Sequence, residues 1–271
     1  MNIALTTIAR FTLIDALRSR WLWLAAASGV LTLALATFAG SMALTERGSV
    51  MLAAAAPIAR LQAVLLMAML TIASVVREIQ ERSLLLMLAA PISRSQWLFG
   101  KLAGWVLLAW LTALIAALPL ALLQLTPALL VWTLSLACEL SLTSAAALLF
   151  ALILRQVAAA VLATLGFYAA ARLIGVILLI NERAPLELGA ADWLSSAVLK
   201  MVAAVLPRFD LYTQTDWLLT SIQPTVGYSL PEMTTAMAAN AVSLAPVMLQ
   251  TLLFAALLLT VAALDLRRSE L

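Results

Sequence analysis

Glu139 is the side chain best placed for chemistry in this sequence, because it is an acid inside a long apolar run. It follows Cys138 directly and precedes three hydroxyl residues, Ser141, Thr143 and Ser144. A charged group at the depth of a lipid hydrocarbon layer is costly, and such groups tend to line transport paths or to pair with one another. We therefore expect Glu139 to line a translocation path or to contact a second copy. The alternative is a protonated or hydrogen-bonded packing acid.

Two arginines also fall within apolar runs. Arg172 is the natural counter-ion for Glu139, since pairing reduces the cost of burying both charges. The alternative for Arg172 is a side chain that reaches the membrane interface or binds lipid headgroups. We expect Arg60 to lie near the outer leaflet and to extend its guanidinium to the interface in the same way.

The missing residue types limit the chemistry open to this chain. It has no histidine and one cysteine. It therefore lacks the commonest general base and metal ligand, and no intramolecular disulfide can form. We expect no catalytic residue, no metal and no cofactor bound by this chain. An integral-membrane enzyme is disfavoured, because it needs reactive side chains clustered at one depth.

The composition indicates an all-α integral membrane protein. Of 271 residues, 65% are hydrophobic and 11% are charged, whereas a soluble domain is roughly half apolar and about a quarter charged. The mean hydropathy is +1.09. Long runs of Ala, Leu and Val predict helices rather than the alternating pattern of a barrel. A single permease domain, 1–271, accounts for the whole chain.

Six apolar runs are long enough to be membrane spans, after a weakly amphipathic helix at 2–20 that we expect to lie in the interface as an elbow. The first run alone would reach about 33 Å as a helix. The second is interrupted by Pro57 and Arg60. The predicted spans are 21–42, 51–76, 102–123, 129–154, 157–180 and 242–264.

Positive residues predict the topology, because they favour the cytoplasmic side. With the N-terminus inside, ten Lys and Arg residues fall in cytoplasmic segments and four fall outside. We expect both termini in the cytoplasm of a bacterial inner-membrane protein. The outer segment 181–240 contains apolar positions at helical spacing, which predicts helices at the outer surface or partly re-entrant ones.

The cytoplasmic segment 77–101 combines charge, a short apolar helix and a proline between two spans. Glu78 and Arg82 are four residues apart and can pair on a helix. Ser93 can cap the helix that becomes the third span. Gly100 and Gly104 have the spacing that permits close helix packing. A helix docked between two spans could move both together; the alternative is a solvated loop.

The pattern E-x-x-E-R-S-x-x-x-x-L-A-A-P-I-S-R-x-x-x-x-x-G-K, over residues 78–101, resembles the cytoplasmic loop of ABC-2 type transporter permeases. It is most similar to the branch associated with multicopper-enzyme maturation, the NosY-like permeases. The elbow helix, six spans and outer helical segment resemble that family in layout. Many members have a glycine where this chain has Leu84, so the resemblance does not define where the helix starts. The element 206–210 also resembles one found before the last span of these permeases.

The resemblance implies that residues 78–88 form a coupling helix seated on a cytosolic ATPase. The partners it implies are that ATPase, which would bind ATP and Mg, and a second permease copy in a homodimer. A periplasmic accessory protein and membrane lipid are further expected partners, and nucleic acid is not. Export is the direction it implies. The residues expected to contribute to coupling are Glu78, Glu81, Arg82, Ser83, Leu85, Pro91, Ser93 and Arg94.

Two other functions remain open on the sequence. An ion-coupled secondary transporter using Glu139 and Arg172 would need no ATPase. It should show internal repeats and several ionisable groups within the membrane, and the sequence shows no clear repeat. A structural subunit that anchors a partner would have the same cytoplasmic segment. No phosphate-binding loop is present, because Gly100-Lys101 is followed by Leu102 and lacks the upstream glycine.

Overall fold

The computed structural model of the chain describes residues 2–44, 46–81, 94–183, 198–199, 201–203, 206–219 and 244–268. These residues form helices joined by short turns, and none of them lies in a β-strand. The helices are α1 (Asn2–Arg18), α2 (Trp21–Ser41), α3 (Arg47–Gln80), α5 (Arg94–Leu123), α6 (Pro127–Leu154), α7 (Val157–Arg183), α9 (Asp210–Leu219) and α11 (Leu244–Arg268). The all-α prediction is confirmed for this part of the chain.

Five of these helices, α2, α3, α5, α6 and α7, are long and apolar enough to cross a membrane. They coincide with the first five predicted spans, although α3 and α5 extend well beyond them on the side of residues 77–101. The predicted span 242–264 overlaps α11, whose apolar part within the described residues is the shorter Val247–Ala263. The chain is therefore an all-α protein with several membrane-spanning helices.

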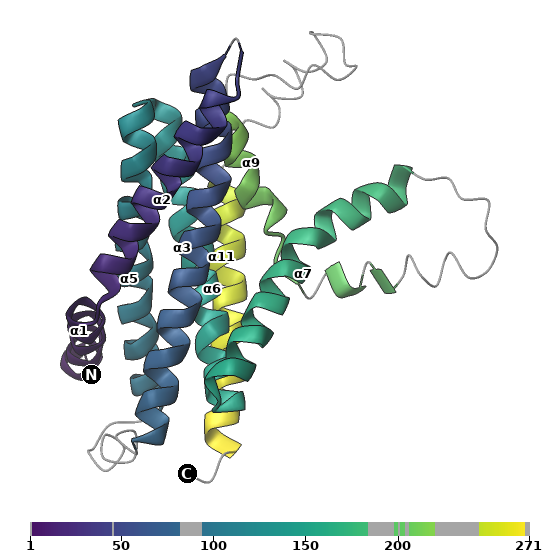
Figure 1. Cartoon of the computed structure of the whole chain (residues 1–271). Helices are drawn as coiled ribbons and strands as arrows, with labels where there is room; N and C mark the ends of the chain where they lie inside the picture. The colour runs from purple at the N-terminus through teal and green to yellow at the C-terminus, as the bar shows by residue number, and fades with distance from the viewer. Residues whose placement is uncertain are drawn as a thin grey trace.

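The central helix of the bundle is α6. It is buried along almost its whole length, and α3, α5, α7 and α11 all pack against it. Its small residues explain this position, because Ser141, Ser144 and the alanines at 145–147 let neighbouring helices approach closely. In Figure 1, α2, α3, α5, α6 and α11 run side by side, while the far end of α7 leans away from them.

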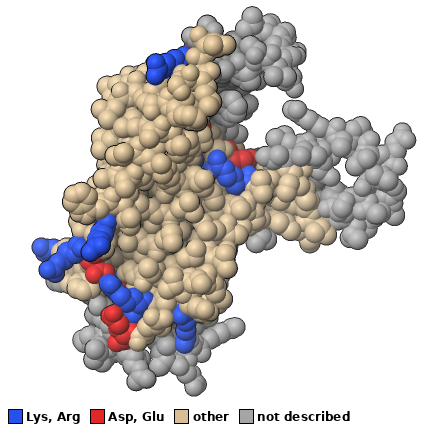
Figure 2. Space-filling model, in the orientation of Figure 1, with Lys and Arg blue, Asp and Glu red and all other residues tan. Residues whose placement is uncertain are grey.

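The elements predicted to be cytoplasmic lie toward one end of the bundle. The end of α3, the start of α5 and the end of α11 lie toward the lower end in Figure 1, and the start of α2 lies above them, beside α1. There α1 is seen nearly end-on, so it lies across the bundle axis, as expected of an elbow helix. Figure 2 shows most of the visible charged residues at this end and few at the opposite one.

The helix α3 continues through Pro57, where the sequence predicted an interruption. A proline inside a helix removes one backbone hydrogen bond and clashes with the preceding turn. Its neighbours Ala55, Ala56 and Ala59 are buried in the bundle core. Their packing outweighs the local preference of the proline, which explains why the helix does not end there.

The close contact between α1 and α5 occurs at Gly104. A Cβ added there would lie 2.7 Å from Thr12 Cβ and 2.9 Å from the Ala9 carbonyl oxygen. Gly100, at the other end of the predicted pair, is buried. The close packing predicted for this spacing is therefore present at Gly104, and its partner is the elbow helix.

We expect Gly104→Leu to displace α1 from α5 and to cost about 1–3 kcal/mol, the usual cost of overpacking. The measurement is thermal unfolding of the purified protein in a single detergent. Gly166→Leu on α7 is the matched control, because a Cβ there meets nothing within 4 Å. Equal unfolding temperatures for the two variants would contradict the close packing of α1.

Candidate functional site

The predicted acid, Glu139, lies near the middle of α6 and is fully buried. It is twelve residues from Pro127, or about 18 Å along the helix axis. Four elements meet around it, because α3, α7 and α9 all pack against this part of α6. A carboxylate at this depth requires partners, since an isolated buried charge is strongly unfavourable.

Arg60 of α3 is the main partner of Glu139. Its Nη1 bonds Glu139 Oε2, its Nη2 lies 2.9 Å from Thr215 Oγ1, and Nε and Nη2 lie 3.1 and 2.9 Å from Asp216 Oδ1. The guanidinium carbon also lies 5.4 Å from the centre of the Trp132 ring. Arg60 has no exposed surface. The expectation that it reaches the membrane interface is therefore wrong, because two acids within the bundle hold it.

Tyr168 and Arg172 of α7 complete the cluster on the other side of Glu139. The Tyr168 hydroxyl donates to Glu139 Oε1 at 2.8 Å and accepts from Arg172 Nη1 at 2.7 Å. The direct distance from Arg172 Nη1 to Glu139 Oε1 is 3.9 Å, and Arg172 is one-third exposed. Glu139 and Arg172 are thus brought together as predicted. Tyr168 links them, and Arg60 is the closer counter-ion.

The short helix α9 is held inside the bundle by this cluster. Trp132 Nε1 donates to Asp216 Oδ1 at 2.6 Å, and Ser135 Oγ donates to the Tyr212 carbonyl at 3.0 Å. Phe209 is fully buried, and its amide donates to the Ala171 carbonyl at 3.3 Å. These contacts pack α9 against the long helices, and its position at the outer membrane surface or partly re-entrant stays a prediction.

Tyr212 fixes α9 to α11. Its hydroxyl lies 2.7 Å from Thr251 Oγ1 and 3.4 Å from the Val247 carbonyl oxygen. The hydroxyl donates to the Val247 carbonyl. Gly175 allows the start of α9 to approach α7, because a Cβ there would lie 2.5 Å from Asp210 Cγ. The segment that begins α9 is therefore packed against three long helices.

The cluster is balanced in charge, with the two arginines Arg60 and Arg172 facing the two acids Glu139 and Asp216. Each of its charged side chains has a hydrogen-bond partner, which is the condition under which buried ionic groups are tolerated. Such a cluster can hold α3, α6, α7 and α9 in one arrangement. If the helices move, its arginines and acids can exchange ionic partners and hold a second arrangement. No group of three or more His, Cys, Asp or Glu placed as metal ligands occurs among the described residues.

Sequence reasoning missed Trp132, Tyr168, Thr215 and Asp216 as members of this site. Asp216 lies on the same face of α9 as Tyr212, four residues earlier, which is a signal for a buried helix face. The signal names no partner, since Asp216 and Arg60 are 156 residues apart in the chain. The tertiary structure alone brings them together.

The predicted coupling segment is described only at its two ends. Residues 82–93, with Arg82, Ser83, Leu85, Pro91 and Ser93, lie outside the described residues, as does most of 181–205 and all of 220–243. At the first end, Glu78 forms an ion pair with Lys101 of α5, and Arg77 lies 3.9 Å from Glu81. Arg94 begins α5. The charged residues of α3 thus connect to the next span.

The Glu78–Lys101 pair is largely shielded from solvent, with 2% of the Lys101 side chain and 15% of the Glu78 side chain exposed. The Lys101 ammonium lies 5.9 Å from the centre of the Trp105 ring. Arg77 reaches α1, with its Nη2 3.5 Å from Asp15 Oδ2. The ends of α1, α3 and α5 are therefore joined by charged contacts at one end of the bundle.

Taken together, the fold and these two clusters define an all-α, multi-pass membrane protein with ionic contacts at mid-depth and at one end. No protein-family model matches the sequence, and no curated protein matches it significantly.

Proposed function

We propose that this chain is the membrane-spanning permease subunit of an ATP-driven transporter of the ABC-2 type, with the ATPase on a separate chain. The observation that carries the proposal is the shielded Glu78–Lys101 pair, which joins the ends of α3 and α5 on either side of residues 82–93. The first and last residues of the pattern that resembles ABC-2 permeases are these same two. A partner that pushes on this segment would therefore move two spans as one.

The proposed layout has six spans, with α11 as the sixth. At 25 residues, α11 is about 37 Å long and can cross a bilayer, although its strictly apolar part is shorter. The concentration of charge at one end of the bundle supports a cytoplasmic position for that end and for both termini, in a bacterial inner membrane. A homodimer, a periplasmic accessory protein and export as the direction of transport belong to the same proposal.

The Arg60 cluster has a place in this mechanism. It lies at mid-depth and joins α3, which ends at the proposed ATPase site, to α9 on the outer side. A displacement of α3 driven by the ATPase would move Arg60 relative to Glu139 and Asp216. Through these contacts, a movement of α3 at the cytoplasmic end would change how α9 packs in the bundle.

Exchanging the charges at Glu81 and Arg82 tests the coupling role of the segment. We expect the variant Glu81→Arg, Arg82→Glu to insert normally and to lose its ATPase partner, because the docking charges are reversed. Glu81 is a suitable site since 63% of its side chain is exposed. The measurement is co-purification of the ATPase with the detergent-solubilised protein. Unchanged co-purification together with unchanged transport would count against the proposed docking site.

An ion-coupled secondary transporter is the second candidate, and the same cluster favours it. Four ionisable groups meet within the bundle, where the sequence alone indicated one acid and two arginines within apolar runs. In that function Glu139 would carry the coupling proton or ion. Glu139→Gln should then abolish uptake or efflux driven by an ion gradient in vesicles free of ATPase. Transport that needs ATP and an added ATPase would exclude this candidate.

A further inference from the structure

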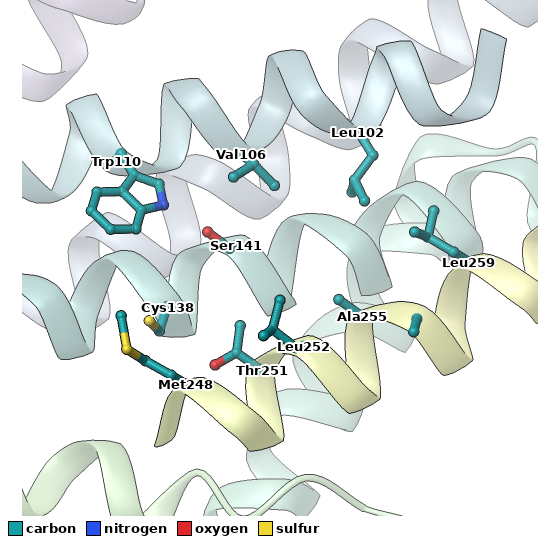
Figure 3. Close-up of a pocket in the computed structure, with 11 residues that line it drawn as sticks. Leu102, Val106, Trp110, Cys138, Ser141, Met248, Thr251, Leu252, Ala255 and Leu259 are labelled. Atoms are coloured by element: carbon teal, nitrogen blue, oxygen red, sulfur yellow. The ribbon is translucent and has the colours of Figure 1, made fainter. Parts of the chain in front are cut away.

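A second feature of the bundle lies on a different face of α6 from the Arg60 cluster. A cavity of about 520 Å³ opens between α5, α6 and α11. Leu102 and Leu259 lie at one end, and Trp110 and Met248 lie at the other, so the cavity runs along the helices (Figure 3). Neither of the functions proposed above uses it.

The dimensions of the cavity limit what can occupy it. Leu102 and Trp110 are eight residues apart on α5, or about 12 Å, and Met248 and Leu259 are eleven apart on α11, or about 16 Å. The mean cross-section is therefore roughly 30–45 Å². A hydrocarbon chain, with neighbours about 4.5 Å away, needs roughly 20 Å² and fits this space. A helix of a second copy is at least about 10 Å wide and is the competing occupant.

The lining is chemically suited to hydrocarbon. None of the described side chains that line the cavity is charged. Its two hydroxyl residues already have partners, since Ser141 donates to the Ala137 carbonyl and Thr251 bonds the Val247 carbonyl and Tyr212. No unpaired side-chain hydroxyl is left to recognise a polar ligand. Apolar cavities of this kind exclude water and take up apolar molecules.

The opening of the cavity faces the outside of the bundle. Leu252 at its rim is 70% exposed, and Met248 and Trp110 are about 40% exposed. The helix α5 is long and apolar enough to cross a membrane, and Val247–Ala263 of α11 is apolar. With α11 as the proposed sixth span, the surrounding medium at this rim is lipid. We propose that this cavity, which we call the α5–α11 slot, binds one acyl chain of a membrane lipid lying parallel to the helices.

The slot is connected to the helix α9 through one of its lining residues. Thr251, which lines the slot, bonds the Tyr212 hydroxyl of α9, and Cys138 in its wall precedes Glu139. A bound chain would therefore support the wall of α6 and α11 against which α9 packs. Lipid binding in the slot does not require an ATPase, so its test is independent of the test of the permease proposal.

The full-length protein in vesicles of phosphatidylethanolamine and phosphatidylglycerol provides the test. A trace of phosphatidylethanolamine carries a photoactivatable diazirine within one acyl chain, and the crosslinked peptides are mapped by mass spectrometry. We expect adducts concentrated on slot residues of α5, α6 and α11. The variants Ala255→Trp and Val106→Trp fill the slot from opposite walls. A Trp ring in the slot takes up the space of the chain, so each variant should lower the adduct yield on slot residues to the level seen on exposed residues outside the slot.

Leu249→Trp is the matched control, because Leu249 is on α11, 59% exposed, and not part of the slot lining. Its adduct yield should equal that of the unchanged protein. Equal yields in the filling variants, or adducts spread evenly over exposed residues of α5 and α11, would overturn the proposal. A crosslink to a second copy at the slot would overturn it as well.

A measurement on the unaltered chain covers the case in which the filling variants do not fold. Cys138 is the single cysteine and is 6% exposed, and it lines the slot. Its alkylation by N-ethylmaleimide should become slower after phosphatidylethanolamine is added back to delipidated protein, because a chain in the slot covers the Cys138 side chain. An alkylation rate that does not change with added lipid would contradict an acyl chain in the slot.

Discussion

Replacing Arg60 by methionine should destabilise the bundle by about 3–5 kcal/mol, the usual cost of removing one partner from a buried ion pair. Methionine replaces the aliphatic part of the Arg60 side chain but not its guanidinium, so the loss combines the missing ionic contacts with the space that the guanidinium filled. Glu139 and Asp216 would be left with Arg172 as the remaining cation in the cluster, 3.9 Å from Glu139. The measurement is thermal unfolding of the purified protein in a single detergent.

Two further variants make this result specific to the Arg60 contacts. Arg172→Met should cost less, because Arg172 is one-third exposed and its hydrogen bond goes to a tyrosine hydroxyl. Arg60→Lys should fall between the two, since an ammonium keeps the charge and cannot match the planar set of donors that reaches both acids. If Arg60→Met lost no more stability than Arg172→Met, the result would contradict the central position of Arg60.

Replacing Glu78 by lysine should produce an effect of similar size at the cytoplasmic end. Lys101 is almost fully buried and would then face a like charge with no carboxylate beside it. We expect a loss of about 3–5 kcal/mol of stability. If the pair transmits force from the proposed ATPase, we also expect that any remaining folded protein transports poorly. Thermal unfolding and ATP-dependent transport in vesicles measure the two effects.

The exchange of both residues is the control for this prediction. Glu78→Lys combined with Lys101→Glu restores opposite charges across the same gap and should recover at least half of the lost stability. Residues in direct contact are expected to depart from additivity in this way. A double variant that is as unstable as the sum of the two single variants would show that the contact contributes little.

Most of the fold was predictable because membrane spans are a local property of the sequence. The first five spans follow from runs of apolar residues, and the structure has a helix over each of them. The differences lie where tertiary packing overrides a local rule. Pro57 does not break α3, and α5 begins at Arg94, well before the apolar run at 102–123.

The site was predictable only in part, because ionic partners in a bundle are far apart in sequence. Glu139 was recognisable as an acid within an apolar run, and Arg172 was its natural partner by position. The closer partner, Arg60, could not be identified without the packing of α3 on α6. Local spacing was similarly incomplete for Glu78: the helical rule suggests Arg82, whereas the structure brings Lys101 across from the neighbouring helix.

The most direct test of the proposed function is a pull-down of the protein, solubilised in mild detergent from its native membrane, with mass spectrometry of the bound proteins. A stoichiometric ATPase with nucleotide-binding motifs is the predicted partner, and it should disappear when the charges of Glu81 and Arg82 are exchanged. Several mild detergents guard against loss of a weak partner. An absence of any ATPase in all of them would contradict the permease proposal and favour ion-coupled transport through Glu139.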